Sequence, residues 1–144
     1  MDPRMHLLTL GVTDLDRSVR FYRDGLGWPT SMKEGEDVAF FQLGPMVLAL
    51  WGREQLAEDA RMPAGEKAVF SGVAPAQCVA SKAEVDAIQD KARAAGATIT
   101  KPASDTFWGG YSCYFTDPDG YAWEIAWNPF WELTPDGGVR LPSG

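Results

Sequence analysis

The sequence predicts an α+β fold in which two tandem βαβββ units form facing mixed sheets around a cleft. The first observation is a repeated order of elements, because a strand, a helix and three more strands occur once before residue 52 and again after residue 69. The second is a repeat in local sequence: residues 40–45 parallel 114–118, and 46–50 parallel 121–125. Two such units bury together apolar surface that neither can bury alone, so we expect a single domain.

The expected organisation follows from where these patterns begin and end. We place the first unit at 1–52, a connector with a short helix at 53–68, the second unit at 69–129 and a C-terminal tail at 130–144. The 144 residues are 45% hydrophobic, which is ordinary for a domain that folds without disulfides. Cys78 and Cys113 lack the spacing of a thiolate metal site.

The first unit begins with an alternating apolar strand over 5–12. A helix follows at once, because Leu15, Val19, Tyr22 and Leu26 form one apolar stripe at helical spacing. Strands are expected over 30–33, 38–43 and 46–51, separated by a turn at 34–36 and by the Gly44-Pro45 turn. Residues 53–60 are expected to form a short exposed helix.

The second unit begins with a strand over 73–79. Ser81 and Glu84 form a capping box that opens a helix ending at Gly96. Strands are expected over 97–101, 111–116 and 121–127. The last two are joined by an Asp-Pro-Asp-Gly turn, in which Pro118 presets φ and Gly120 adopts a positive φ. The tail from residue 136 is expected to be loosely ordered apart from Val139 and Leu141.

Glu124 is the candidate functional residue of the last strand. Strand alternation places Trp123 and Ile125 on one face and Ala122, Glu124 and Ala126 on the other. Small side chains around one acid leave room for a ligand. Glu124 is therefore a candidate catalytic base or an anchor for a cation. The alternative is a structural carboxylate that accepts hydrogen bonds from a neighbouring strand or from water.

The other candidate ligand-binding residues are mostly aromatic. Phe41 and Trp51 share odd parity with Ala49, and Thr9 shares parity with Leu7, so these side chains are expected to line the opposing wall. Residues 105–111 place two glycines after an aromatic pair, which predicts a mobile loop bearing Trp108 and Tyr111 at the cleft mouth. Packing in the core or at a sheet end is the alternative role for these rings. The predicted ligand-binding set is Thr9, Phe41, Trp51, Trp108, Tyr111 and Glu124.

Charge and composition restrict the partners. The net charge of −7 and the pI near 4.6 disfavour nucleic acid, which requires clustered Lys and Arg. No apolar run is long enough to span a membrane, and the N-terminus lacks an apolar leader segment, so we expect a cytoplasmic protein without a membrane partner. Phe130 and Trp131 extend apolar area past the last strand, which predicts a C2 homodimer unless both rings fold back beneath Trp127.

The chain resembles the vicinal oxygen chelate superfamily, which includes glyoxalase I, extradiol dioxygenases and bleomycin-resistance proteins. The resemblance is carried by residues 12–27 and 117–124. It implies that enzymatic members hold a divalent metal at positions matching Leu7, Ala49, Ala74 and Glu124. Only Glu124 can coordinate an ion, so no metal and no cofactor are expected. A register slip of one residue in the first strand would make His6 a ligand candidate and restore the divalent-metal alternative.

Two functions therefore stay open, and the sequence does not decide whether the protein is an enzyme. The first is small-molecule binding of the bleomycin-resistance type, independent of metal, which sequesters an aromatic or cationic compound. The alternative is a glyoxalase- or dioxygenase-like lyase or isomerase that uses Glu124 as a base or metal ligand. A dimeric scaffold without a small-molecule site is the third interpretation.

Overall fold

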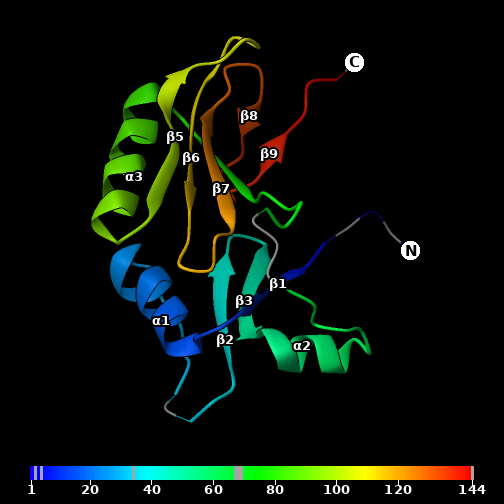
Figure 1. Cartoon of the computed structure of the whole chain (residues 1–144). Helices are drawn as coiled ribbons and strands as arrows, with labels where there is room; N and C mark the ends of the chain where they lie inside the picture. Colours follow the sequence, from blue (N-terminus) through cyan, green and yellow to red (C-terminus); the bar gives the residue numbers. More distant parts are fainter. Residues whose placement is uncertain (2, 4, 34, 67–69, 144) are drawn as a thin grey trace. The chain divides into compact units, whose positions relative to one another are not determined.

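The computed structural model of the chain describes residues 1, 3, 5–33, 35–66 and 70–143. The chain divides into two compact units, residues 1–68 and 69–144. Both units combine helical structure with a mixed sheet, so the predicted α+β class is confirmed (Figure 1). The expected turn at residue 34 and the expected boundary between residues 68 and 69 fall on positions outside the described residues.

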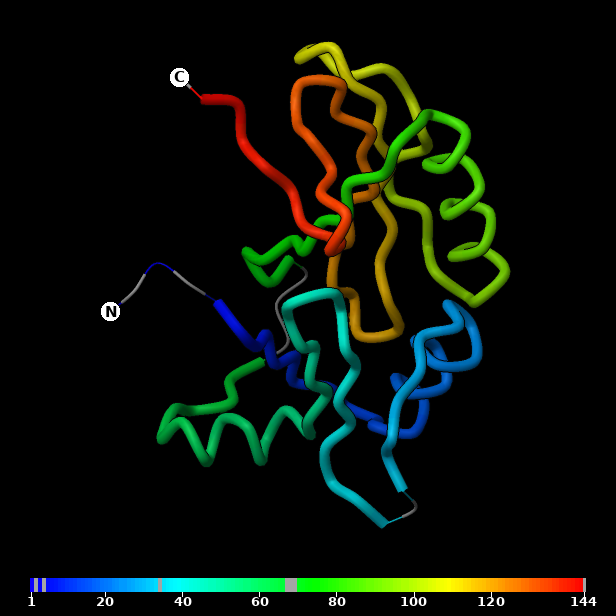
Figure 2. Tube along the Cα trace, turned by 180° about the vertical axis from the view of Figure 1, so that it is seen from behind, coloured from blue at the N-terminus to red at the C-terminus, as the bar shows by residue number. Residues whose placement is uncertain are grey.

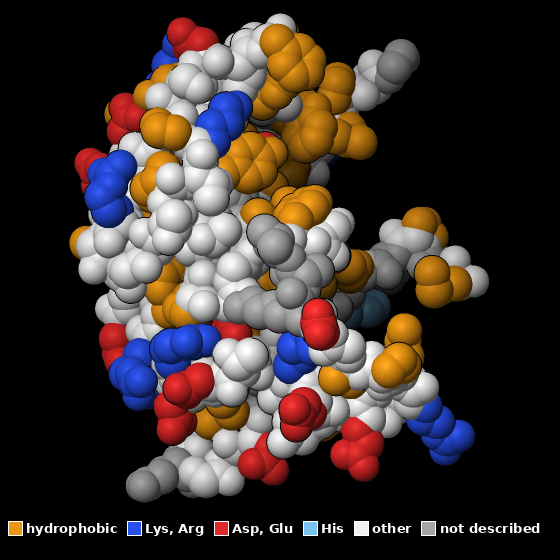
Figure 3. All heavy atoms as spheres, in the orientation of Figure 1, with side chains coloured by type: hydrophobic (Ala, Val, Ile, Leu, Met, Phe, Trp, Pro, Cys, Tyr) orange, Lys and Arg blue, Asp and Glu red, His pale blue; other side chains and the backbone are white. Residues whose placement is uncertain are grey.

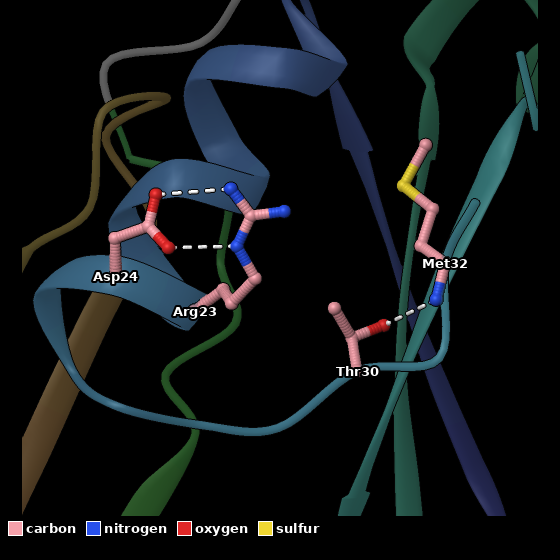
Figure 4. Close-up of polar contacts among 4 residues, drawn as sticks. All are labelled: Arg23, Asp24, Thr30 and Met32. Carbon is pink, nitrogen blue, oxygen red and sulfur yellow. Dashed lines mark hydrogen bonds and ion pairs between the residues drawn. The ribbon is translucent and has the colours of Figure 1, made fainter. Parts of the chain in front are cut away.

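The sheet of the first unit has three strands in the order β1-β3-β2. Strands β1 (Leu7–Val12) and β3 (Met46–Gly52) are parallel, and β2 (Val38–Leu43) is antiparallel to β3 across the Gly44-Pro45 turn. The expected strand over 30–33 is reduced to one bridge between Thr30 and Phe41. The Thr30 hydroxyl donates to the Phe40 carbonyl at 2.8 Å. It also accepts from the Met32 N–H at 3.3 Å (Figure 4), and these two hydrogen bonds replace strand pairing there.

The first helix changes its winding partway along. α1 (Leu15–Val19) is capped by the Asp14 carboxylate, which accepts from the Arg17 N–H at 3.0 Å, and it continues as the π-helix η1 (Arg20–Gly25). An exposed Arg23–Asp24 ion pair of 2.7 Å lies near the end of η1 (Figure 4). Tyr22 is buried as predicted, and its neighbour Phe21 is buried as well. The wider π turn places both rings inward, which a stripe at α-helical spacing does not foresee.

Helix α2 (Arg53–Asp59) confirms the short exposed helix after β3. It packs against β1 and β3, where Arg53 lies so close to Gly11 that a Cβ on Gly11 would sit 3.1 Å from the Arg53 Cα. Across the described residues, no helix combines the length and apolar character needed to span a membrane.

The second unit has a four-stranded sheet in the order β4-β7-β6-β5. Helix α3 (Lys82–Ala94) packs against β5, β6 and β7 and begins at the Ser81 cap, whose side chain accepts from the Glu84 N–H at 3.2 Å. The strand bounds are β4 Ala76–Val79, β5 Thr98–Asp105, β6 Tyr111–Thr116 and β7 Ala122–Trp127. β4 is shorter than expected, and β5 is longer because it continues through two irregularities in its pairing with β6.

The turn between β6 and β7 adopts the expected conformation. The Asp117 carboxylate accepts hydrogen bonds from the N–H groups of Asp119 at 3.0 Å and Tyr121 at 2.8 Å, and its side chain is buried with 4% exposure. Gly120 has a φ of 84°, in the left-handed region that favours glycine. This turn therefore fixes the register in which β6 and β7 pair.

The C-terminal segment contains a hairpin that the sequence does not predict. β8 (Glu132–Leu133) pairs with β9 (Val139–Arg140), so the expectation of a loosely ordered tail is wrong for these residues (Figure 2). The Thr134 side chain organises the turn by accepting from the Gly138 N–H at 3.0 Å. Exposed hydrophobic side chains gather over this hairpin (Figure 3); they include Phe130, Trp131, Leu133, Val139 and Leu141. The expected C2 homodimer stays a prediction.

Candidate functional site

Glu124 lies on one face of the second-unit sheet, together with side chains from all four strands. The β6–β7 register places Tyr114 opposite Glu124 and Thr116 opposite Ala122. β4 places Ala76 beside Glu124, and β5 places Lys101 opposite Tyr114. We call this surface the Glu124 face; its residues are Ala76, Cys78, Lys101, Ser112, Tyr114, Thr116, Ala122, Glu124 and Ala126. α3 covers the opposite face, where Cys113, Phe115, Trp123 and Ile125 are buried.

The two ends of the Glu124 face differ in accessibility. Ser112 and Ala126 are buried, whereas Tyr114, Thr116, Ala122 and Glu124 are partly exposed. The accessible part therefore centres on a carboxylate with alanine neighbours on its own strand and on β4. The alanine neighbours expected around Glu124 are therefore present, and the space they leave for a ligand stays a prediction.

The Glu124 carboxylate has a polar partner that the sequence interpretation missed. A hydrogen bond from the Tyr114 hydroxyl to Glu124, reinforced by burial and by the carboxylate's charge, raises the pKa of Tyr114 to about 12. Counting back from a 117–120 turn pairs residue 113, not 114, with 124. The loop instead spans the five residues 117–121, closed by a hydrogen bond from the Asp117 N–H to the Tyr121 carbonyl at 3.0 Å, and this extra residue places Tyr114 opposite Glu124. A carboxylate has about four acceptor positions, so Glu124 retains acceptor capacity for a second donor.

Cys78 and Lys101 complete the polar surroundings. Burial raises the pKa of the Cys78 thiol, and the Glu124 charge acts in the same direction, so the uncharged thiol is favoured. The Lys101 ammonium lies 5.9 Å from the centroid of the Tyr114 ring. The accessible part of the face therefore combines one carboxylate, one phenol and one ammonium group.

Tyr111 does not belong to this face, and its expected grouping with Glu124 is wrong. It pairs with Trp127 on the face covered by α3, and its hydroxyl donates to the Asp86 carboxylate at 2.7 Å. The Lys82 ammonium lies 5.5 Å from the Tyr111 ring centroid. Five residues separate β6 from β7, so odd-numbered residues of one strand pair with odd-numbered residues of the other. Tyr111 therefore lies on the face opposite to that of the even-numbered Glu124.

Trp108 lies in the tight loop between β5 and β6. The Thr106 hydroxyl accepts from the Gly110 N–H at 2.9 Å, and the Thr106 N–H donates to the Gly110 carbonyl at 2.9 Å. The indole ring folds over Gly110, where a Cβ would collide with it. Gly110, over which the ring lies, precedes Tyr114 by four residues, about 13 Å of strand. The ligand-binding role of Trp108 stays a prediction.

In the first unit, Thr9 and Trp51 share a face as expected, but Phe41 does not join them. Thr9 lies beside Ala49 in the pairing of β1 with β3. Phe41 pairs with Leu48, is fully buried and lies 6.0 Å from the Tyr22 ring, so its assignment to a ligand wall is wrong. Because the turn between β2 and β3 has two residues, odd-numbered residues of β2 pair with even-numbered residues of β3. Phe40 therefore occupies the position opposite Ala49.

The two units carry different chemistry at matching positions. Phe40 opposite Ala49 in the first unit corresponds to Tyr114 opposite Glu124 in the second. An apolar pair thus stands where the second unit has its hydrogen-bonded polar pair. The candidate chemistry is concentrated on the second unit.

The side chains present do not fit a divalent metal at the positions implied by the resemblance. Leu7, Ala49 and Ala74 carry no donor atom, and one carboxylate is a poor ligand set for such an ion. Within the described ranges, no group of three His, Cys, Asp or Glu side chains is placed to hold a metal. The alternative ligand His6 is exposed and precedes β1, where its carbonyl accepts from the Val47 N–H at 2.9 Å.

The Tyr114–Glu124 contact makes a prediction about pH. Because the folded pKa of Tyr114 is raised from 10.0 to about 12, the contact stabilises the fold fully below pH 10. This contribution is lost as the pH rises toward 12. We expect a spectrophotometric phenolate titration, taken as wild type minus Tyr114→Phe, to show this late transition. Glu124→Gln should move it down toward the ordinary value; an unchanged transition in that variant would contradict the contact.

The comparisons with known proteins identify the family and support the fold. A model of the Glyoxalase/Bleomycin resistance protein/Dioxygenase superfamily matches residues 4–125. The uncharacterized protein YraH of Bacillus subtilis is 34% identical over 122 residues, which cover 82% of this chain and 93% of that protein. A glyoxalase-related enzyme from Fulvimarina pelagi is 35% identical with a TM-score of 0.88, over 98% of this chain and 99% of the other.

A further similar structure is that of a named enzyme. The lactoylglutathione lyase from Agrobacterium tumefaciens is 26% identical with a TM-score of 0.69, and the match covers 89% of this chain and 96% of that one. The matched residues of the family model include both segments that carry the resemblance up to Glu124. The chain belongs to the Glyoxalase/Bleomycin resistance protein/Dioxygenase superfamily.

Proposed function

We propose that the protein binds a small organic molecule on the Glu124 face without a metal. The expected ligand is an aromatic compound with a cationic or hydrogen-bond-donating group. The observation that carries the proposal is the Tyr114–Glu124 pair on an accessible sheet face with alanine neighbours. Its carboxylate accepts the ligand's donor, and the Tyr114 ring offers an aromatic surface.

The charge of the chain supports this choice. With a net charge of −7, the protein attracts cations more strongly than anions at long range. At short range, the hydrogen bond from Tyr114 helps to keep Glu124 oriented for a second donor. Sequestration needs only shape, aromatic area and this one oriented charge, whereas the metal chemistry implied by the resemblance needs donor atoms that Leu7, Ala49 and Ala74 lack.

The test compares benzylamine with benzyl alcohol, which share a ring and differ in the charge of the donor. We expect benzylamine to bind more tightly to the wild type, with amide chemical shift changes centred on Tyr114 and Glu124. Glu124→Gln should weaken benzylamine about tenfold and leave benzyl alcohol nearly unchanged, because a charge-assisted hydrogen bond becomes a neutral one. Its melting temperature should stay near that of the wild type.

The matched control is Glu58→Gln, which removes the same charge from an exposed position on α2. It should leave both affinities unchanged. Retained benzylamine affinity in Glu124→Gln, or shift changes confined to other surfaces, would reject the assigned role of Glu124. Turnover of a carbonyl substrate by metal-free protein, abolished in Glu124→Ala, would instead favour the enzyme alternative.

A further inference from the structure

Lys101 reaches the Glu124 face through an irregularity in β5. Ile99 pairs with Phe115, yet Lys101 pairs with Tyr114, so Thr100 is an extra residue between them. In an uninterrupted ladder Thr100 would oppose Tyr114 and Lys101 would oppose Cys113, on the face covered by α3. The bulge therefore aims an ammonium at the accessible face instead of at the helix.

The residues after Lys101 maintain this geometry. The register shifts again between Lys101 and Ser104, so one further residue is accommodated there. Pro102 has no N–H to donate, and the Ala103 N–H donates to the Gln89 side chain of α3 at 2.7 Å instead of to β6. The two residues after Lys101 thus help to hold the strand out of the regular ladder.

The ammonium of Lys101 is available to a ligand. It lies 5.9 Å from the Tyr114 ring centroid, is exposed, and forms no ion pair with any residue that the structure describes. Lys82, on the other side of the sheet, differs because its ammonium pairs with Asp105 at 2.8 Å. A cation next to an aromatic ring, on the same face as an oriented carboxylate, is complementary to a molecule with charges of both signs.

We propose that Lys101 is a specificity-determining residue that binds an anionic group, such as a carboxylate, on the molecule whose donor group is held by Glu124. The ligand class is then an aromatic zwitterion, with its ring against Tyr114, its donor on Glu124 and its anion on Lys101. This inference rests on the proposed function of the Glu124 face.

The change in affinity when a carboxylate is added to the ligand tests whether Lys101 binds an anion. Because the chain carries a net charge of −7, adding a carboxylate to a ligand should weaken binding unless a local cation receives it. At about 0.15 M salt, distant charges are largely screened and a local contact is retained. A gain in affinity on adding a carboxylate therefore reports a nearby cation.

The probes are benzylamine and the ortho, meta and para isomers of (aminomethyl)benzoate, which vary the separation of the two charges. Affinities are measured by amide chemical shift titration of wild type, Lys101→Met, Lys101→Arg and Glu124→Gln. We expect at least one isomer to bind the wild type about tenfold more tightly than benzylamine. Lys101→Met should abolish that gain, measured as the ratio of isomer to benzylamine affinity, and should raise benzylamine affinity slightly because it removes a like charge near the cationic probe. Lys101→Arg should keep most of the gain.

Lys91→Met is the matched control, because it removes an exposed lysine from α3. It should preserve the gain. If no isomer binds more tightly than benzylamine, or if Lys101→Met keeps the gain, the inference about Lys101 fails while the benzylamine result for Glu124→Gln still supports the proposed function. If benzylamine and every isomer leave the Glu124 face unperturbed, both proposals fail.

Discussion

Replacing Phe41 by alanine is expected to lower the free energy of unfolding by about 3 to 5 kcal/mol, as for other buried phenylalanines. Phe41 is fully buried, and its ring centroid lies 6.0 Å from that of Tyr22 and 6.4 Å from that of Trp28. Truncation leaves a cavity between η1 and the sheet and removes these ring contacts. Urea denaturation followed by tryptophan fluorescence would measure the loss.

The neighbouring Phe40→Ala is the matched control, since it removes the same ring from a side chain that is 52% exposed. It should change stability by less than about 1 kcal/mol. If Phe41→Ala instead kept its stability and weakened binding of the aromatic amines, the ring would belong to a ligand site, and its assignment to the core would be wrong.

Asp117→Ala is expected to cost about 2 to 3 kcal/mol of stability. The buried carboxylate accepts from the N–H groups of Asp119 and Tyr121, and alanine leaves both donors without this partner. The turn also holds the β6–β7 register, so the change should lower the phenolate pKa of Tyr114 by loosening its contact with Glu124. Both quantities are measured on the same variant, by thermal unfolding and by phenolate titration.

Asp117→Asn separates the hydrogen bonds from the charge, because an asparagine side-chain oxygen accepts from the same two N–H groups. It should recover more than half of the stability lost in Asp117→Ala. Equal loss in the two variants would show that the negative charge, and not the pair of turn hydrogen bonds, stabilises this segment.

Much of the fold can be predicted from local patterns because the relevant physics is local. The Ser81 cap, the Asp117 turn and most of the expected strands are each determined by a few adjacent residues, and the structure contains them; the strand expected over 30–33 is the exception. The π winding after Val19 and the hairpin through Thr134 were missed. Both depend on contacts that a search for regular periodicity does not register.

The site was predicted less well because membership of a face depends on how strands pair. Parity within β7 correctly isolated Glu124, and parity across the β2–β3 turn failed for Phe41 because the turn length was not used. Neither parity within a strand nor turn length predicts the face of Lys101, because a bulge in β5 shifts its pairing with β6 by one residue. The register of strand pairing therefore decides which of two adjacent residues lies on the accessible face.

The bulged course of β5 also affects the behaviour of the protein at high concentration. β5 is an edge strand, and a regular edge offers a row of backbone donors and acceptors to any other chain. Here Pro102 lacks a donor, the Ala103 N–H is already bonded to Gln89, and a lysine stands beside them. The bulge that presents a cation to a ligand thus also discourages edge-to-edge association of strands from different molecules. Removing the bulge to alter ligand preference should therefore reduce solubility.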